Sequence, residues 1–143
     1  MLPGPLKISK IEASNYLKGL MLLIRKDHRI TETENILLMR IGKSLGFDPE
    51  FCEITINEIL NNKFIEDTPP VFLQKELAIK FIRDGLAVIF SDNIMHPAEE
   101  KWLIATAEKN DIDITLFYEF KKEYSAQQQN IAKLEVDDLI VSQ

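Results

Sequence analysis

The feature of this sequence that most constrains its fold is an internal repeat. Residues 26 to 34 read KDHRITETE and residues 91 to 99 read SDNIMHPAE, and in both stretches, here called the first and second corner, an Asp precedes a Glu by seven positions. The two corners are 65 positions apart, and apolar residues around them recur at the same offset: Tyr16 with Phe81, Leu17 with Ile82, Ile24 with Ile89, Leu38 with Leu103 and Phe47 with Ile112. Self-similarity of this kind indicates two copies of one structural unit.

Apolar periodicity predicts three helices in each copy. Residues at i, i+3, i+4 and i+7 share one helix face. The predicted faces contain Leu17, Leu20, Met21 and Ile24; Leu38, Ile41 and Leu45; Cys52, Ile56 and Ile59; Phe81, Ile82 and Ile89; Trp102, Leu103 and Thr106; and Leu116, Phe117 and Phe120. Gly46 marks a helix end, and Asp48 with Pro49 marks the next start. We find no convincing strand alternation, and therefore expect an all-α, compact bundle of two similar three-helix halves.

The length of the chain fits one domain. It has 143 residues, of which 45% are hydrophobic, so it can bury a core. Pro69 and Pro70 interrupt the helical pattern and indicate a connection between the halves. The predicted parts of this single domain, 1–143, are halves at about 14–62 and 74–124, a linker at about 63–73 and a C-terminal tail at about 125–143. The tail has three alternatives, which are an extension of the last helix, a further short helix and a mobile end.

The net charge argues against nucleic acids and anionic lipid surfaces as partners, and the cysteine content gives no indication of an oxidising compartment. The formal net charge is −6, without an evident basic patch, so nucleic acids and anionic lipid surfaces are not expected partners. The single cysteine, Cys52, cannot form an internal disulfide. The start MLPGPLKISK lacks the apolar core of a signal peptide, and the run GLMLLI is too short to span a bilayer. We expect a cytoplasmic protein without direct membrane insertion.

A purely structural interpretation accounts for part of each corner. Thr31 and Glu34 have the spacing of a capping box, in which each side chain binds the amide of the other residue. His96 and Glu99 form a weaker version of the same arrangement. Capping thus explains both glutamates. It explains the corner aspartates less well, because they follow apolar helices where negative charge is disfavoured, although an Asx-type turn could accommodate them.

A metal site is the second interpretation of the corners. Carboxylate oxygens are preferred ligands of Mg²⁺, Ca²⁺ and Mn²⁺. In a pseudo-symmetric bundle the two corners can face each other, and four carboxylates would then converge on a divalent cation, in one shared site or in two. The candidate ligands are Asp27, Glu34, Asp92 and Glu99.

Other chemistry has little support in the sequence. An EF-hand is excluded because Arg29 and Leu38 occupy the third and twelfth positions of a loop that starts at Asp27. Neither histidine has a Glu three residues upstream, as a di-iron bundle requires, and there is no Cys-x-x-Cys pair, P-loop or dinucleotide fingerprint. We therefore do not expect an enzyme, and metal-assisted hydrolysis ranks as the weakest alternative.

The repeat and its acidic corners resemble the tellurite-resistance TerB and TerB-like family. The resemblance covers most of residues 14–124 and rests on YLKGLMLLIRKDHRITETENILLMRIGKSLGFD and FIRDGLAVIFSDNIMHPAEEKWLIATAEKNDID. Members are all-helical, with two three-helix halves and the pattern Asp-Gly-x-(Ile/Val)-(Ser/Thr/His)-x-x-Glu at each corner. The residues that match this pattern are Asp27, Glu34, Asp92 and Glu99. His28 and Asn93 replace the family's glycine, and Asn tolerates a left-handed backbone better than His.

The resemblance implies a small intracellular module of a stress response that binds metal through its corners and acts through protein partners. It implies no catalytic activity, and it does not by itself imply tellurite resistance. The alternative is an interaction scaffold with purely structural corners, in which surface grooves or the segment IAKLEVDDLIVSQ engage another protein. In that case a chain without residues 126–143 is expected to fold but to lose its partner.

Overall fold

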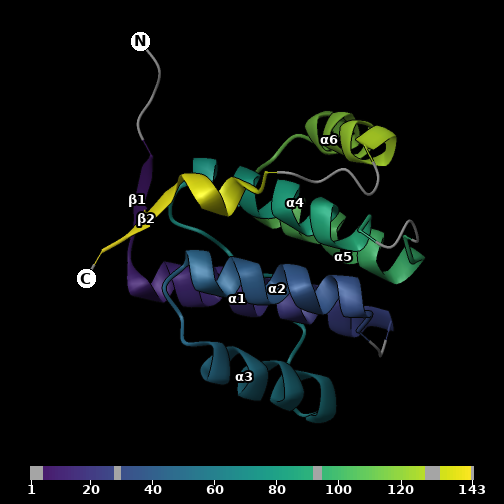
Figure 1. The fold of residues 1–143 in the computed structure, drawn as a ribbon. Coiled ribbons are helices and arrows are strands. Elements are labelled where there is room, and N and C mark those ends of the chain that lie inside the picture. The colour runs from purple at the N-terminus through teal and green to yellow at the C-terminus, as the bar shows by residue number, and fades with distance from the viewer. Residues whose placement is uncertain (1–4, 28–29, 92–94, 128–132, 143) are drawn as a thin grey trace.

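Helices make up most of the structure, as the sequence predicts. The computed structural model describes residues 5–27, 30–91, 95–127 and 133–142, without the side chains of residues 27 and 127 (Figure 1). Its elements are β1 (Leu6–Ile8), α1 (Lys10–Ile24), the 3-10 helix η1 (Arg25–Asp27), α2 (Glu32–Ser44), α3 (Pro49–Asn61), α4 (Lys75–Ile89), α5 (Pro97–Lys109), α6 (Ile114–Gln127), the 3-10 helix η2 (Glu135–Asp138) and β2 (Leu139–Val141). The predicted all-α bundle is confirmed.

Local sequence signals place the helix ends. The Asp48 side chain accepts a hydrogen bond from the Glu50 amide at 2.8 Å, and Pro49 occupies the first position of α3. Gly46 follows α2 with a φ of 87°, which glycine adopts without a steric penalty. Both boundaries agree with the sequence prediction. Helix α1 begins at Lys10, before the predicted start of the first half, because Ser9 caps it by accepting from the Glu12 amide at 3.1 Å.

The helices repeat their packing in the two halves. Helix α3 packs on α1 and α2, and α6 packs on α4 and α5 in the same manner. Figure 1 shows α3 and α6 on opposite outer sides of the molecule, with the other four helices between them. Helices α1 and α4 contact each other at the centre, and each is buried along most of its length. The repeat in the sequence is therefore also a repeat in the packing.

A close approach between the halves depends on a glycine of α1. A Cβ atom at Gly19 would lie 2.8 Å from Cε2 of Phe81 on α4, and 3.0 Å from Cγ of Pro70 in the connection. The Phe81 ring is fully buried and packs edge-on against Tyr16. A larger residue at position 19 would thus separate α1 from α4.

The predicted linker is attached to both halves. Arg25, which follows α1, donates to the carbonyl oxygens of Ile59, Asn62 and Ile65 at 2.6 to 3.2 Å and pairs with Asp67. Trp102 on α5 donates from its indole nitrogen to the Asp67 carbonyl at 2.7 Å.

Further along the linker, the Asn110 side chain donates to the Pro70 carbonyl and accepts from the Phe72 amide, each at 2.9 Å. The connection is non-helical, as Pro69 and Pro70 predict, but it belongs to the packed structure.

Two strands near the chain ends differ from the prediction. Strands β1 and β2 pair in parallel, with Leu6 opposite Leu139 and Ile8 opposite Val141. We expected no strand, and three residues are too few to display an alternating pattern. The described part of the tail, residues 133–142, does not extend α6 but forms η2 and β2. Of the three alternatives for the tail, a docked short helix is the nearest to this arrangement.

Among the residues that the structure describes, no helix has the length and apolar character that crossing a membrane would require.

Candidate functional site

Glu34 of the first corner lies in the first turn of α2. Its side chain is only 1% exposed. Its Oε1 accepts from the Thr31 amide at 2.9 Å, while its own amide donates to Thr31 Oγ1 at 3.1 Å. This arrangement is the predicted capping box, and it orients the carboxylate of Glu34 toward the start of the helix.

Glu99 of the second corner occupies the equivalent turn of α5. Its side chain has no exposed surface, and its Oε1 accepts from the His96 amide at 3.1 Å. Pro97 begins the helix, as expected from the sequence. The two glutamates therefore have matching positions, matching cap contacts and nearly complete burial.

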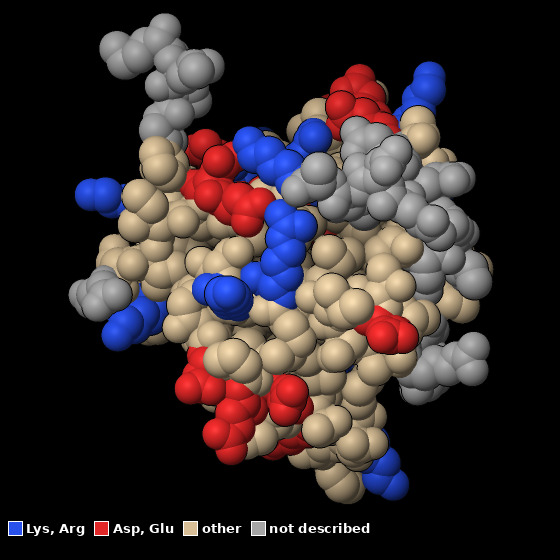
Figure 2. All heavy atoms as spheres, in the orientation of Figure 1, with Lys and Arg blue, Asp and Glu red and all other residues tan. Residues whose placement is uncertain are grey.

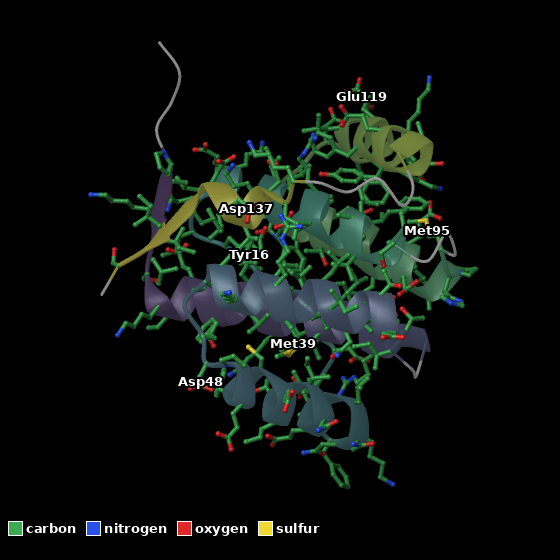
Figure 3. All side chains as sticks on the ribbon, in the orientation of Figure 1. Tyr16, Met39, Asp48, Met95, Glu119 and Asp137 are labelled. Carbon is green, nitrogen blue, oxygen red and sulfur yellow. The ribbon has the colours of Figure 1, made fainter. Side chains whose placement is uncertain are left out.

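The helix starts that belong to the two corners lie at one end of the bundle. Figure 1 shows the start of α2 and the start of α5 on the same side of the molecule, and Met95, which is labelled in Figure 3, marks the approach to α5 there. The segment η1, which leads into the first corner, contacts α5. The starts of α2 and α5 are therefore at the same end of the bundle, and the orientation of the two corners toward each other stays a prediction.

The structure places only part of the predicted ligand set. Asp92 lies outside the described residues, and for Asp27 only the backbone, at the end of η1, is described. Within the described ranges, no group of three or more His, Cys, Asp and Glu side chains could hold a metal ion. The convergence of Asp27, Glu34, Asp92 and Glu99 on a cation therefore stays a prediction.

Basic groups near the first corner pair with the linker. The Lys26 ammonium lies 2.7 Å from Asp67 Oδ2, and Arg25 pairs with the other oxygen. Partial burial acts to raise the pKa of Asp67, but the hydrogen bonds from Lys26 and Arg25 outweigh it and lower that pKa below its usual value. A pocket of about 390 Å³ beside this cluster also includes Lys63.

A second polar site, which the sequence did not reveal, is centred on Asp84 of α4. Its side chain is fully buried. Asp84 Oδ2 accepts from the Tyr16 hydroxyl at 2.6 Å and from the Val136 amide at 3.0 Å, and Oδ1 accepts from the Glu135 amide at 2.6 Å. One carboxylate thus joins α1, α4 and the C-terminal segment.

Burial determines the acidity of this site. It raises the pKa of Asp84 from 3.8 to about 7, although the hydrogen bonds from Tyr16 and the two amides act to lower it. Burial, followed by the charge of Asp84, raises the pKa of Tyr16 well above its usual value. The signal in the sequence is an Asp on an otherwise apolar helix face. The repeat offers no help, because Gly19 stands at the position equivalent to Asp84.

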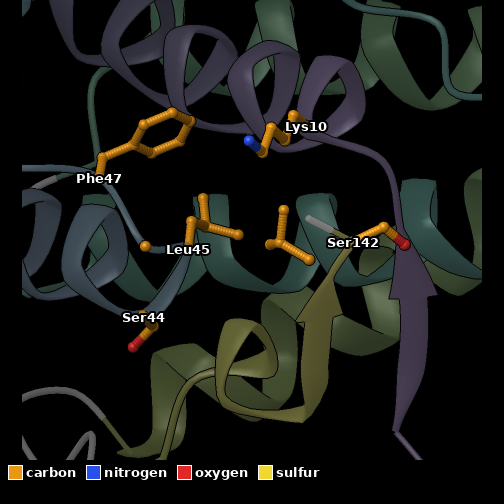
Figure 4. Close-up of a pocket in the computed structure, with 7 residues that line it drawn as sticks. Lys10, Ser44, Leu45, Phe47 and Ser142 are labelled. Carbon is orange, nitrogen blue, oxygen red and sulfur yellow. The ribbon is translucent and has the colours of Figure 1, made fainter.

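A cavity of about 440 Å³ opens near the C-terminal strand (Figure 4). Its described lining consists of Lys10, Ser44, Leu45, Gly46, Phe47, Val141 and Ser142. The polar side chains of this described lining are those of Lys10, Ser44 and Ser142.

Comparisons with protein-family models, with curated proteins and with solved structures found no match for this chain. The fold and the two polar sites define its structural class instead. It is an all-helical bundle of two similar halves, with paired acidic corners at one end and a carboxylate that holds the C-terminal segment.

Proposed function

We propose that this chain is a TerB-like, non-catalytic binding module whose two acidic corners bind a divalent cation. The observation that supports this proposal is the burial of Glu34 and Glu99 in equivalent turns at one end of the bundle. Each glutamate uses one oxygen in its cap contact. A carboxylate has two oxygens and about four acceptor positions, so a cap contact and a cation are chemically compatible.

The cation would join the two halves through their helix starts. Mg²⁺, Ca²⁺ and Mn²⁺ prefer carboxylate oxygens, and the repeat supplies Asp27 and Asp92 at the matching positions of the two corners. In this proposal the protein takes part in an intracellular stress response and acts through protein partners, as the TerB resemblance implies. Tellurite resistance itself is not part of the proposal.

The alternative is an interaction scaffold in which the corners are structural. The capping contacts of Glu34 and Glu99 favour this alternative, because they give both residues a role without a metal. Helix α3 also presents Phe51 and Ile54 to solvent, at 43% and 58% exposure. Acidic side chains gather over α3 in Figure 2, so a partner at this face would carry basic groups.

Thermal unfolding in the presence of each cation tests the proposal. The wild-type chain is compared with the variant Asp27→Asn/Asp92→Asn in Mg²⁺, Ca²⁺, Mn²⁺ and chelator. A cation at a hundred times its dissociation constant stabilises the native state by about 2.7 kcal/mol. We expect this stabilisation in the wild type and its loss in the variant.

A matched control comes from the same repeat. Asp48 and Asp113 are also 65 positions apart, and each accepts at 2.8 Å from the amide two residues later, at a helix start away from the corners. The variant Asp48→Asn/Asp113→Asn removes the same charge and should keep the full response to the cation. A wild-type chain whose unfolding no cation changes would rule out the metal site and leave the scaffold.

A further inference from the structure

The C-terminal segment, residues 133–142, lies on the bundle in the manner of a bound peptide. In Figure 1 it crosses the beginning of α4, lies to one side of α2 and ends beside β1. The contacts agree with this view, since η2 packs on α4 and α2 while β2 pairs with β1. The surface on which it lies, here called the tail groove, is formed by residues 6–84, far earlier in the chain.

The tail groove binds the backbone of the segment at two places. At one end Asp84 accepts from the amides of Glu135 and Val136. At the other end β1 adds β2 as a parallel strand, and the Ser142 amide donates to the Ile8 carbonyl at 2.8 Å. Main-chain contacts of this kind give affinity without requiring a particular side chain, as in peptide recognition by strand addition.

The tail groove also distinguishes side chains. Three aliphatic residues of the segment are buried at 0 to 8% exposure, and these are Leu134, Val136 and Leu139. The alternate residues are acidic: Glu135 lies 3.8 Å from Lys80 Nζ and 3.7 Å from Arg83 Nε.

The next acidic residue, Asp137, is bound by α2. It accepts from Arg40 at 3.0 Å and from the Ser44 hydroxyl at 3.3 Å, and Figure 3 shows it on η2. Figure 2 shows acidic and basic side chains together in this region. The tail groove therefore has an apolar floor, which buries the three aliphatic side chains, and a basic rim, which consists of Arg40, Lys80 and Arg83.

The side chain of Asp84, which lies in the tail groove, is oriented by a contact with helix α1. The Tyr16 hydroxyl donates to Asp84 at 2.6 Å, and both residues belong to helices of the central layer. Glu135 and Val136 lie in the first turn of η2, so a carboxyl group held in this way can accept from the amides of a segment that forms a similar turn in the groove. When the segment leaves, the oxygens of Asp84 lose these two amides, and water or the amides of another segment must take their place.

We propose that the tail groove is a peptide-binding site for segments in which aliphatic and acidic residues alternate, and that a partner protein carrying such a segment displaces the C-terminal segment from it. The basic rim favours acidic side chains and the apolar floor favours aliphatic ones, and together they determine this choice of ligand. Three buried aliphatic side chains and the polar contacts of the segment must offset the entropy of ordering ten residues, and we therefore expect the segment to open locally before the rest of the fold. This inference does not depend on a cation at the corners.

Binding of a labelled peptide, KLEVDDLIVS, to the full-length chain tests the proposal. The variant Val136→Asp weakens the chain's own segment and leaves the groove unchanged. Because the apparent affinity scales with the fraction of open groove, we expect the variant to bind the peptide about tenfold more tightly than the wild type, or better. A peptide with the same Val-to-Asp change should bind neither chain. The control Ile140→Asp, at a position 44% exposed, should behave as the wild type.

Hydrogen exchange on the wild-type chain provides a test that does not require a variant to fold. The amides of Glu135 and Val136 should exchange at least about tenfold faster than those in the middle of α1 and α4, because the segment opens locally. Exchange of these amides only with global unfolding would overturn the proposal. So would a Val136→Asp chain that is folded by circular dichroism and binds the peptide no better than the wild type.

Discussion

Asp84 shows how strongly one residue depends on its surroundings. A carboxylate without exposed surface is costly unless it is hydrogen-bonded, and three donors meet this requirement: the Tyr16 hydroxyl and the two consecutive amides of Glu135 and Val136. Even so, its pKa rises to about 7, so burial outweighs the donors. The groups that act on its pKa are Tyr16 from α1 and Glu135 and Val136 from η2.

The first prediction at this scale concerns pH. Folded chains hold the proton of Asp84 up to about pH 7, whereas unfolded chains release it near 3.8. The stability that Asp84 contributes is therefore fully present below pH 3.8 and is lost as the pH rises through 7. We expect the free energy of unfolding of the wild type, relative to Asp84→Asn, to fall with a slope of up to about 1.4 kcal/mol per pH unit in this window.

Urea unfolding of both chains from pH 4 to pH 8 measures this difference. The comparison isolates Asp84, because the other titratable groups contribute the same slope to both chains. Tyr16→Phe serves as a control. It removes a donor that lowers the pKa of Asp84, so the pKa should rise further, as a carboxyl NMR titration can show. Parallel pH profiles for the wild type and Asp84→Asn would contradict the raised pKa.

At the scale of elements, helix starts and helix ends are satisfied in different ways. The starts of α1, α2 and α3 use side chains from within a few residues, at Ser9, Thr31 and Asp48. The end of α3 uses Arg25, more than 30 residues earlier, whose guanidinium binds three carbonyl oxygens. Caps of the first kind can be predicted from spacing, but a cap of the second kind depends on the tertiary fold.

The prediction at this scale is that Arg25→Ala destabilises the chain by about 1 to 3 kcal/mol, because it leaves partly buried carbonyls without a donor. Arg25→Lys should not restore the loss, since one ammonium cannot reach the same set of carbonyls as a planar guanidinium. Urea unfolding of both variants measures the effect.

Lys26→Ala is the matched control. Lys26 pairs with Asp67 at 2.7 Å, and Asp67 is 43% exposed, so the loss should be at most about 1 kcal/mol. If Arg25→Lys were as stable as the wild type, the network of carbonyl contacts would not contribute as described.

At the scale of the whole molecule, the two halves approach each other closely at Gly19. Gly19 permits α1 and α4 to approach, and the Phe81 ring beside it also packs against Phe72 and Trp102. Interiors of this density tolerate added volume poorly. The two similar halves thus form one packed structure.

The prediction at this scale concerns Gly19→Ala. Alanine favours a helix over glycine by about 1 kcal/mol, but the added Cβ would lie 2.8 Å from Phe81, and overpacking typically costs about 1 to 3 kcal/mol. We expect a net loss of stability, measured by thermal unfolding. Asn15→Ala, on the exposed face of the same helix, is the control and should be neutral or slightly stabilising. Equal stabilisation by both substitutions would contradict a tight interface.

The sequence by itself determined the helices, their order in two similar halves and the capping boxes of the corners. These features arise from interactions within a few residues, and they leave a periodic trace: apolar residues at helical spacing, and Thr31 with Glu34 at the start of α2. The burial of Glu34 and Glu99 agrees with their place in this repeat.

Only the tertiary structure decided which distant groups meet. Strand β1 pairs with Leu139–Val141. The Tyr16 hydroxyl donates to Asp84, and Asp84 also accepts from the amides of the C-terminal segment. None of these pairs has a regular spacing in the sequence. Each pair forms only when segments that are far apart in the chain pack together and exclude water from the groups between them. The environment of Asp84, and with it the tail groove, therefore follows from the packing of the whole chain.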